Sequence, residues 1–233
     1  MIGFIEKCEP SEDFSWVKKL EKINVVSAKI LTDSLIECLI ENKNRIIFHH
    51  GVSGLGPLYE PKVPSVEWSV SQYSKLISSG FPVRQTVLRL SPFIPNDYGV
   101  GAAQAVLEKF KDTELKRIRV HLLRAHLLVV SNFYMNGIDT PYKRNYPEKA
   151  HFQKVSDFLA RYADRYFFES CDDFNVSHIE KNSCVTIQDF RILGLSDEPV
   201  KNANCLQGKK DLVTKRVGCD MGCLYCYNTK VMR

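Results

Sequence analysis

Several features that would assign the chain to a special class are missing from its 233 residues. No apolar run approaches the eighteen or so residues of a membrane-spanning helix. The opening residues, MIGFIEK, lack the layout of a secretory signal peptide. There is also no internal repeat and no low-complexity tract. These absences favour a globular protein without a membrane anchor, and we expect it in the cytoplasm.

The cysteines lack the spacing of a disulfide framework. Five of the eight are scattered, as expected for a reducing compartment: Cys8, Cys38, Cys171, Cys184 and Cys205. The other three, Cys219, Cys223 and Cys226, have the spacing C-x3-C-x2-C, with Tyr225 directly before the last cysteine. Soft thiolates favour iron–sulfur and zinc sites over hard cations, so the sequence predicts that these three are metal ligands.

The composition is that of an ordinary globular protein, with 44% hydrophobic and 25% charged residues. The formal net charge is +5, and it is concentrated at the end of the chain. Residues 201–233 contain seven Lys and Arg against two Asp, whereas the rest is neutral. Two interpretations stay open: the basic segment binds nucleic acid or a phosphorylated substrate, or it offsets the negative charge of a thiolate-ligated cluster.

Strand-like and helix-like segments alternate through most of the chain. We expect strands over residues 24–30, 45–50, 86–90, 118–123 and 166–170. We expect a first helix that begins at residue 32 or 33, and further helices over 66–79, 100–110, 126–136 and 152–162. Such alternation predicts a parallel sheet with helices packed outside it, and so an α/β protein built as a partial or complete (βα) barrel.

The same pattern predicts three parts. Residues 1–22 are expected to form an amphipathic lead-in, residues 23–171 the barrel-like domain and residues 172–233 a cysteine-rich segment packed on the barrel. The last part loses its periodicity and retains short strand-like pieces such as 184–187.

Polar residues lie at or near the C-terminal ends of the predicted strands, where a barrel would have its active-site mouth. They are His49, His50, Arg89, His121 and Arg124. Arg89 is the strongest candidate for binding an anion, because a guanidinium in an apolar strand costs several kcal/mol unless it is paired. The loop 51–56 contains three glycines, which allow close backbone approach to a ligand, but it lacks the full G-x-G-x-x-G dinucleotide pattern.

The cysteine spacing, with the aromatic residue at Tyr225, resembles that of the radical S-adenosylmethionine (SAM) enzymes. The residues of this segment are especially similar to the cluster loop of the spore photoproduct lyase group. The resemblance implies a [4Fe–4S] cluster on Cys219, Cys223 and Cys226. Its fourth iron would bind SAM, and an external donor such as a flavodoxin or ferredoxin would supply the electron that yields a 5′-deoxyadenosyl radical.

The resemblance also suggests which residues bind SAM. Gly54, Gly56 and Glu60 lie in a place comparable to the stretch that binds the SAM amino group in that family. A SAM carboxylate would provide the anion for Arg89, and Tyr225 would pack against the cluster or the cofactor. In the family, however, the cluster loop follows the first strand, whereas here it lies close to the end of the chain.

A longer resemblance covers residues 45–228. The segments GVSGLGPLYEPKVPS, VLRLSPFIPND and CLQGKKDLVTKRVGCDMGCLYCYN are similar to a bacterial family known as domain of unknown function 1848, which is thought to be radical-SAM-like. This sequence departs from that family at Ser91, where an Asp is common, and it lacks the usual Asp-Ile-Pro stretch near the N-terminus.

Two other functions stay open. In the first, Cys205 joins the three clustered cysteines in a structural zinc site, and the chain is a nucleic-acid-binding module. In the second, Cys205 is the fourth ligand of an electron-transfer cluster that does not bind SAM. The sequence does not identify the substrate.

Overall fold

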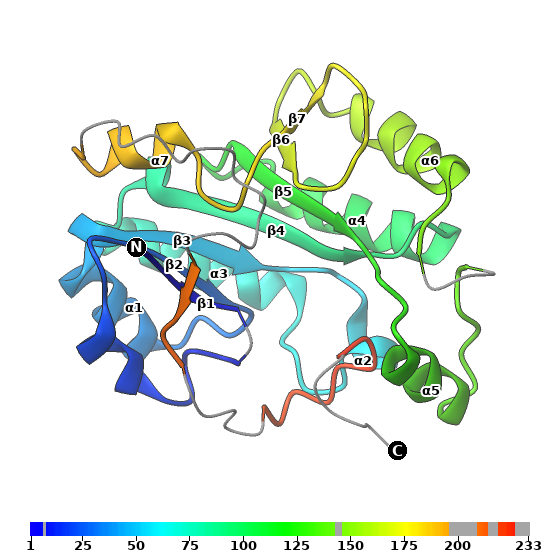
Figure 1. Ribbon diagram of the computed structural model, residues 1–233, viewed down its shortest axis with the longest axis horizontal. Coiled ribbons are helices and arrows are strands. Elements are labelled where there is room, and N and C mark those ends of the chain that lie inside the picture. Colours follow the sequence, from blue (N-terminus) through cyan, green and yellow to red (C-terminus); the bar gives the residue numbers. More distant parts are fainter. Residues whose placement is uncertain (7, 143–145, 196–208, 214–218, 227–233) are drawn as a thin grey trace.

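The computed structural model describes residues 1–6, 8–142, 146–195, 209–213 and 219–226. Within them, eight strands form one sheet in the order β7-β6-β5-β4-β3-β2-β1-β8, and every neighbouring pair is parallel (Figure 1). The strands are Ile2–Ile5 (β1), Ile23–Ala28 (β2), Ile46–Gly51 (β3), Thr86–Phe93 (β4), Arg117–Leu122 (β5), Phe167–Ser170 (β6), Ile179–Lys181 (β7) and Lys209–Asp211 (β8). The predicted α/β class with a parallel sheet is therefore confirmed.

Helices connect most of these strands. They are Asp33–Glu41 (α1), Gly56–Tyr59 (α2), Val66–Ser78 (α3), Asp97–Phe110 (α4), Leu127–Met135 (α5), Lys149–Ala160 (α6) and Ile187–Ile192 (α7), with short 3-10 turns at Phe14–Lys19, Lys43–Arg45 and Val83–Gln85. The side chains of Thr32, Ser65 and Asn96 accept backbone N–H groups at the starts of α1, α3 and α4. No helix in the described part of the chain has the length and apolar character needed to cross a membrane.

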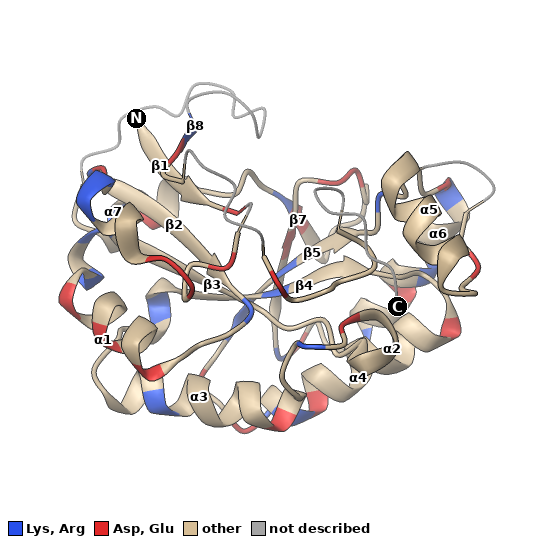
Figure 2. Ribbon diagram, turned by 90° about the horizontal axis from the view of Figure 1, so that it is seen from below, with Lys and Arg blue, Asp and Glu red and all other residues tan. Residues whose placement is uncertain are grey.

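The two faces of the sheet are covered differently. Helices α1, α3 and α4 lie along one face (Figure 2), and two large apolar clusters fill the space between that face and the helices. The other face meets α7, where Phe190 and Val185 pack on Phe4 and Val25. Beyond this small apolar cluster, the α7 face carries buried charged residues, which are described below.

The structure departs from the sequence predictions at both ends of the chain. The expected lead-in, 1–22, contains β1, whose backbone pairs with both β2 and β8. The expected strand-like piece at 184–187 is instead the approach to α7, where Thr186 and Asp189 form a capping box. The segment 172–233 contributes β7, α7 and β8, so β7 and β8 extend the same sheet at its two edges.

Candidate functional site

Residues 219–226, here called the cysteine loop, lie against helices that follow the C-terminal ends of the strands. The backbone N–H of Leu224 donates to the carbonyl oxygen of Tyr59 at 2.9 Å, at the end of α2. On α5, the side-chain amide of Asn132 donates to the carbonyl oxygens of Leu224 and Cys226, at 3.1 and 3.3 Å. Because α2 follows β3 and α5 follows β5, the cysteine loop is held at the strand ends where barrel enzymes have their active sites.

The three cysteines of the cysteine loop are buried to different degrees. Cys223 is buried, and Cys219 and Cys226 are half-buried. Burial raises the pKa of the Cys223 thiol to about 11, even though the Lys29 ammonium acts in the opposite direction.

Glu60 links the cysteine loop to the strand ends. Its carboxylate, 3% exposed, accepts the Lys29 ammonium at 2.7 Å and the hydroxyl groups of Ser53 and Tyr225. Burial alone would raise the pKa of Glu60, but the Lys29 ammonium and these hydrogen bonds lower it overall. The Lys29 nitrogen also lies 5.3 Å from the centre of the Tyr225 ring. The predicted residues Glu60 and Tyr225 are therefore in direct contact.

The two predicted glycines have different surroundings. Both have positive φ, 71° at Gly54 and 63° at Gly56. A Cβ atom on Gly54 would lie 2.7 Å from the carbonyl oxygen of Ala102, so this glycine allows the loop to approach α4 closely. A Cβ on Gly56 would meet only the Tyr98 hydroxyl, at 3.9 Å. Close packing on α4 accounts for Gly54 in this structure, and its predicted role in binding SAM stays a prediction.

Arg89 lies in β4 and is paired with an acidic residue of β1's C-terminal end. Its guanidinium donates to Glu6 at 3.1 Å and to the Ser27 hydroxyl at 3.3 Å, and Lys209 of β8 donates to the same carboxylate at 3.3 Å. Burial would raise the pKa of Glu6, but Arg89 and Lys209 together lower it to about 2. The anion that the sequence led us to expect beside Arg89 is thus Glu6 in this structure.

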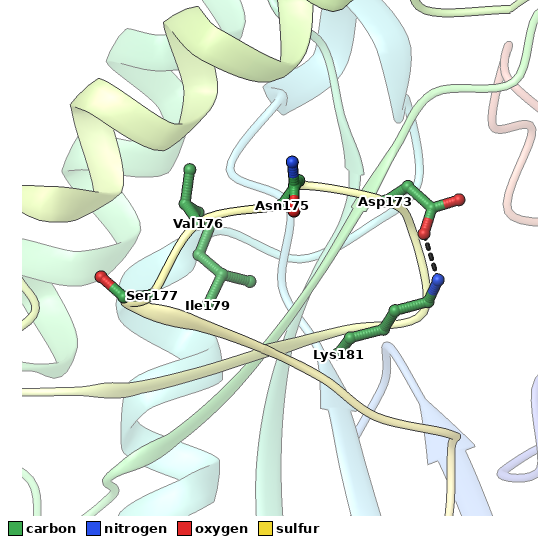
Figure 3. Close-up of a pocket in the computed structure, with 6 residues that line it drawn as sticks. All are labelled: Asp173, Asn175, Val176, Ser177, Ile179 and Lys181. Carbon is green, nitrogen blue, oxygen red and sulfur yellow. Dashed lines mark hydrogen bonds and ion pairs between the residues drawn. The ribbon is translucent and has the colours of Figure 1, made fainter.

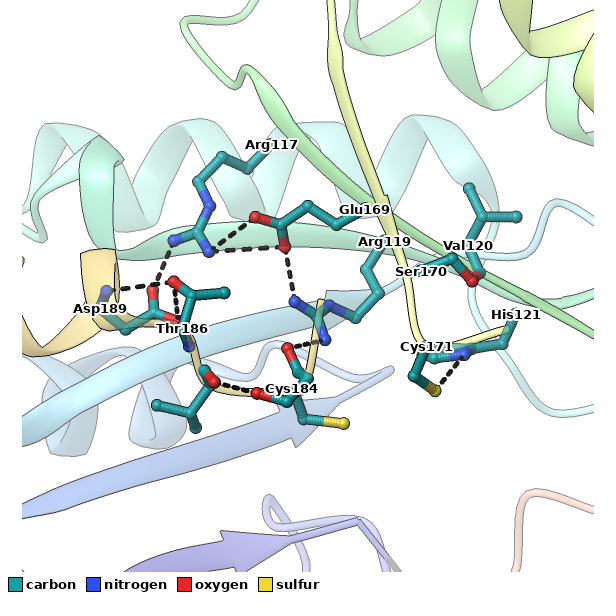
Figure 4. A network of polar contacts seen from close by, with 12 residues as sticks. Arg117, Arg119, Val120, His121, Glu169, Ser170, Cys171, Cys184, Thr186 and Asp189 are labelled. Carbon is teal, nitrogen blue, oxygen red and sulfur yellow. Dashed lines mark hydrogen bonds and ion pairs between the residues drawn. The ribbon is translucent and has the colours of Figure 1, made fainter. Parts of the chain in front are cut away.

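A buried ionic network joins β5, β6 and α7 (Figure 4). The Glu169 carboxylate of β6 accepts hydrogen bonds from Arg119 at 2.6 Å and from Arg117 at 3.1 Å. Arg117 also donates to the carboxylate of Asp189 in α7 at 2.6 Å. His49 of β3 is fully buried, and its two ring nitrogens have no hydrogen-bond partner among the described residues. Burial, then the positive charges of Arg89 and the other arginines, lowers its pKa well below the usual value.

The other candidates at the strand ends do not all lie on the same face of the sheet. His50 points to the helix-covered side, where its ring is within 6.4 Å of the rings of Phe48, Tyr73 and Phe110. His121 lies near the end of β5 and Arg124 follows that strand, and both contact the segment after β6. His50 is therefore a core residue, and the sequence did not distinguish it from its neighbour His49.

Sequence reasoning missed Lys29 and Asn132, which hold the cysteine loop. Lys29 directly follows β2, so the rule applied to the other strand ends would have found it. Asn132 lies within an apolar helix, where a buried amide signals a specific polar partner. The predicted fourth ligand Cys205 and most of the basic segment, including Lys215 and Arg216, lie outside the described residues.

A cavity of about 670 Å³ lies in the connection from β6 to β7 (Figure 3). Its lining includes Asp173 and Lys181, which form an ion pair, together with Asn175 and Val176. None of the predicted site residues lines it. The polar groups that converge at the cysteine loop make that loop, rather than this cavity, the stronger candidate for a functional site.

Comparison with known proteins does not extend this picture, since no family model, no curated protein and no solved structure matches the chain.

Proposed function

We propose that the protein is a radical SAM-type enzyme that holds a [4Fe–4S] cluster on Cys219, Cys223 and Cys226. The observation that carries the proposal is the placement of the cysteine loop at the C-terminal strand ends, against α2 and α5. A purely structural metal site would not need to lie at the C-terminal strand ends, whereas catalysis in parallel α/β folds takes place at those ends.

The sheet order supports a barrel that is permuted relative to other radical SAM proteins. Strand β8 pairs in parallel with β1, and the cysteine loop follows β8 in the sequence. If β8 is counted as the first strand, the cysteine loop follows the first strand, and β1 to β7 come next in order. We infer that the described sheet is an open (βα) barrel with β8 and β7 as its edges, and that the position of the loop near the end of the chain is compatible with the family.

The donor set fits a cluster better than a zinc ion. Three thiolates suit three irons of a cube, since each sulfur binds a different metal atom. The [4Fe–4S] cluster, when bound with SAM at its fourth iron, would supply reductive cleavage of SAM to a 5′-deoxyadenosyl radical.

The chain's own residues would bind and orient the cofactor. Glu60, which already binds an ammonium group at Lys29, has the charge needed for the SAM amino group. Arg89 has the charge needed for a carboxylate, provided that Glu6 shares it. Tyr225 fixes the cysteine loop to Glu60.

The test is the iron and sulfide content of cysteine variants after anaerobic reconstitution. We expect about four irons per wild-type chain, and little iron in Cys219→Ala, Cys223→Ala or Cys226→Ala. Cys38→Ala is the matched control, because Cys38 is buried in α1 among apolar residues of the core. Equal iron in all four variants, or zinc without iron in the wild type, would exclude the proposal.

A second candidate, an electron-transfer cluster with four protein ligands, is favoured by one observation. Cys8 lies close enough to Cys219 for the two thiols to affect each other electrostatically: burial first, then nearby carboxylates and Cys219, raises the pKa of Cys8 to about 11. If Cys8→Ala or Cys205→Ala abolishes iron binding, the cluster has a fourth thiolate and no open iron. Retention of iron in both variants supports the SAM site.

A further inference from the structure

The ends of β5 and β6 bring together three potential metal ligands that belong to neither the cysteine loop nor the buried ionic network. The Cys171 sulfur and His121 Nδ1 are 3.3 Å apart (Figure 4), and Asp172 Oδ2 is 4.0 Å from the same nitrogen. All three ligand atoms lie within 4.8 Å of one another. Donors around a tetrahedral zinc are separated by about 3.3–3.8 Å, so only a small adjustment would let them share one ion.

We propose that His121, Cys171 and Asp172 form a second metal site, selective for zinc or a similar divalent transition metal. One sulfur, one imidazole nitrogen and one carboxylate oxygen are donors that zinc accepts. Three protein ligands leave a fourth position for water or a substrate atom, as in catalytic zinc sites. The thiolate and the carboxylate together carry two negative charges, which match those of a divalent cation.

The surrounding contacts orient these ligands. Asp172 Oδ2 accepts the backbone N–H of Leu122 at 2.9 Å, and Oδ1 accepts Arg124 at 3.2 Å. The backbone N–H of Asp172 donates to the Ser170 hydroxyl at 3.0 Å, and that hydroxyl donates to the carbonyl oxygen of Val120 at 2.7 Å. Such outer contacts commonly fix the ligands of metal sites.

The ring of His121 is oriented through Nδ1 alone. Its Nε2 is buried and has no hydrogen-bond partner in the described part of the chain. The contacts that fix the ring therefore involve the two other ligands, Cys171 and Asp172. All three residues are only partly buried, so an ion can enter from solvent. On binding, the Cys171 thiol would release its proton to the solvent.

The test is a cobalt(II) titration of the full chain in which Cys219, Cys223 and Cys226 are replaced by Ser, so that the cysteine loop cannot bind the metal. We expect one cobalt per chain with a thiolate-to-cobalt charge-transfer band, and displacement of that cobalt by zinc. Cys171→Ser should abolish the band, and Asp172→Asn should weaken the affinity by about 10-fold or more. Cys38→Ser in the same background should leave the band unchanged.

Absence of the band, or its survival in Cys171→Ser, would overturn the proposal. If the triple variant does not fold, zinc analysis of the otherwise unchanged chain decides: Cys171→Ser should lose one zinc per chain, and an equal zinc content would contradict the site. The outcome is independent of the proposed cluster, because iron content reports on the cysteine loop and the cobalt band of the triple variant reports on Cys171.

Discussion

At the scale of single residues, the Glu60 carboxylate connects three segments that are far apart in the sequence. It accepts the ammonium of Lys29 after β2, the Ser53 hydroxyl after β3 and the Tyr225 hydroxyl of the cysteine loop. A buried carboxylate with an adjacent ammonium group stays ionised, because the pair and its hydrogen bonds offset the cost of removing the charge from water. The position of the cysteine loop thus depends in part on one side chain.

Removing one of these hydrogen bonds should weaken the attachment of the loop. Tyr225→Phe deletes the hydroxyl that donates to Glu60, and we expect it to lower the free energy of unfolding by about 2 kcal/mol. Urea denaturation measures the change, with Tyr134→Phe as the control, because Tyr134 is 81% exposed. The control should stay within about 0.5 kcal/mol of the wild type. Equal stability of the two variants would show that the hydrogen bond to Glu60 contributes nothing.

His50 should make the protein sensitive to acid. Burial, assisted by the Lys29 charge, lowers its pKa to about 3, whereas an unfolded histidine titrates near 6.5. Below pH 6.5 the unfolded state therefore binds a proton that the folded state does not, and stability falls as the pH falls.

His50→Phe removes this dependence and retains an aromatic ring beside Phe48 and Tyr73. Between pH 6.5 and 5, we expect the wild type to lose about 2 kcal/mol more stability than the variant. Urea denaturation at several pH values measures both, each relative to its own stability at pH 7. Parallel pH profiles would contradict the assignment of a neutral, buried His50.

At the scale of elements, the connection from β3 to α2 contains two glycines whose surroundings differ. Gly54→Ala would place a Cβ 2.7 Å from a backbone oxygen of α4, and we expect a loss of about 2–4 kcal/mol. Gly56→Ala has similar positive φ but open space, and should cost about 1 kcal/mol. Thermal or urea unfolding of the pair decides. Equal losses would show that contact with α4 does not require Gly54.

The sequence identified the elements with long, regular patterns and missed the short ones. Apolar positions in α3 and α4 recur at helical spacing, and the largely apolar run Ile46-Ile47-Phe48 marks β3 as a strand buried on both faces. Strands β1 and β8 have four and three residues, too few for periodicity to be read. Strand β1 pairs with β2 and with β8, and the pairing with β8 joins residues such as Ile2 and Lys209 that are far apart in the sequence, a contact that no local pattern encodes.

For the candidate site as well, the local pattern was predictable from the sequence and the contacts between distant segments were not. The spacing of Cys219, Cys223 and Cys226 is local and was visible in the sequence. The pairing of Glu60 with Lys29, or of Arg89 with Glu6, depends on which strands are neighbours. The metal-ligand set around His121 likewise requires β5 beside β6, so its cysteine was classed among the scattered ones.

At the scale of the whole molecule, the segment that contains β8 is part of the core. Leu212 directly follows β8, is fully buried, and donates its backbone N–H to the carbonyl oxygen of Phe4 at 3.0 Å. Leu212→Ala should therefore cost about 2–4 kcal/mol, whereas Leu127→Ala, at a residue 80% exposed, should cost about 0.5 kcal/mol or less. A single urea transition shifted in Leu212→Ala would show that β8 unfolds with the sheet. An unshifted transition would contradict its place in the core.

The central claim is that the cysteine loop leaves one iron open for SAM at the mouth of this sheet. Electron paramagnetic resonance of the reduced, reconstituted protein, recorded with and without SAM, tests it most directly. The account predicts a reduced [4Fe–4S] signal whose g values shift when SAM is added. A cluster signal that SAM leaves unchanged would contradict the claim and assign the cluster to electron transfer or to structure.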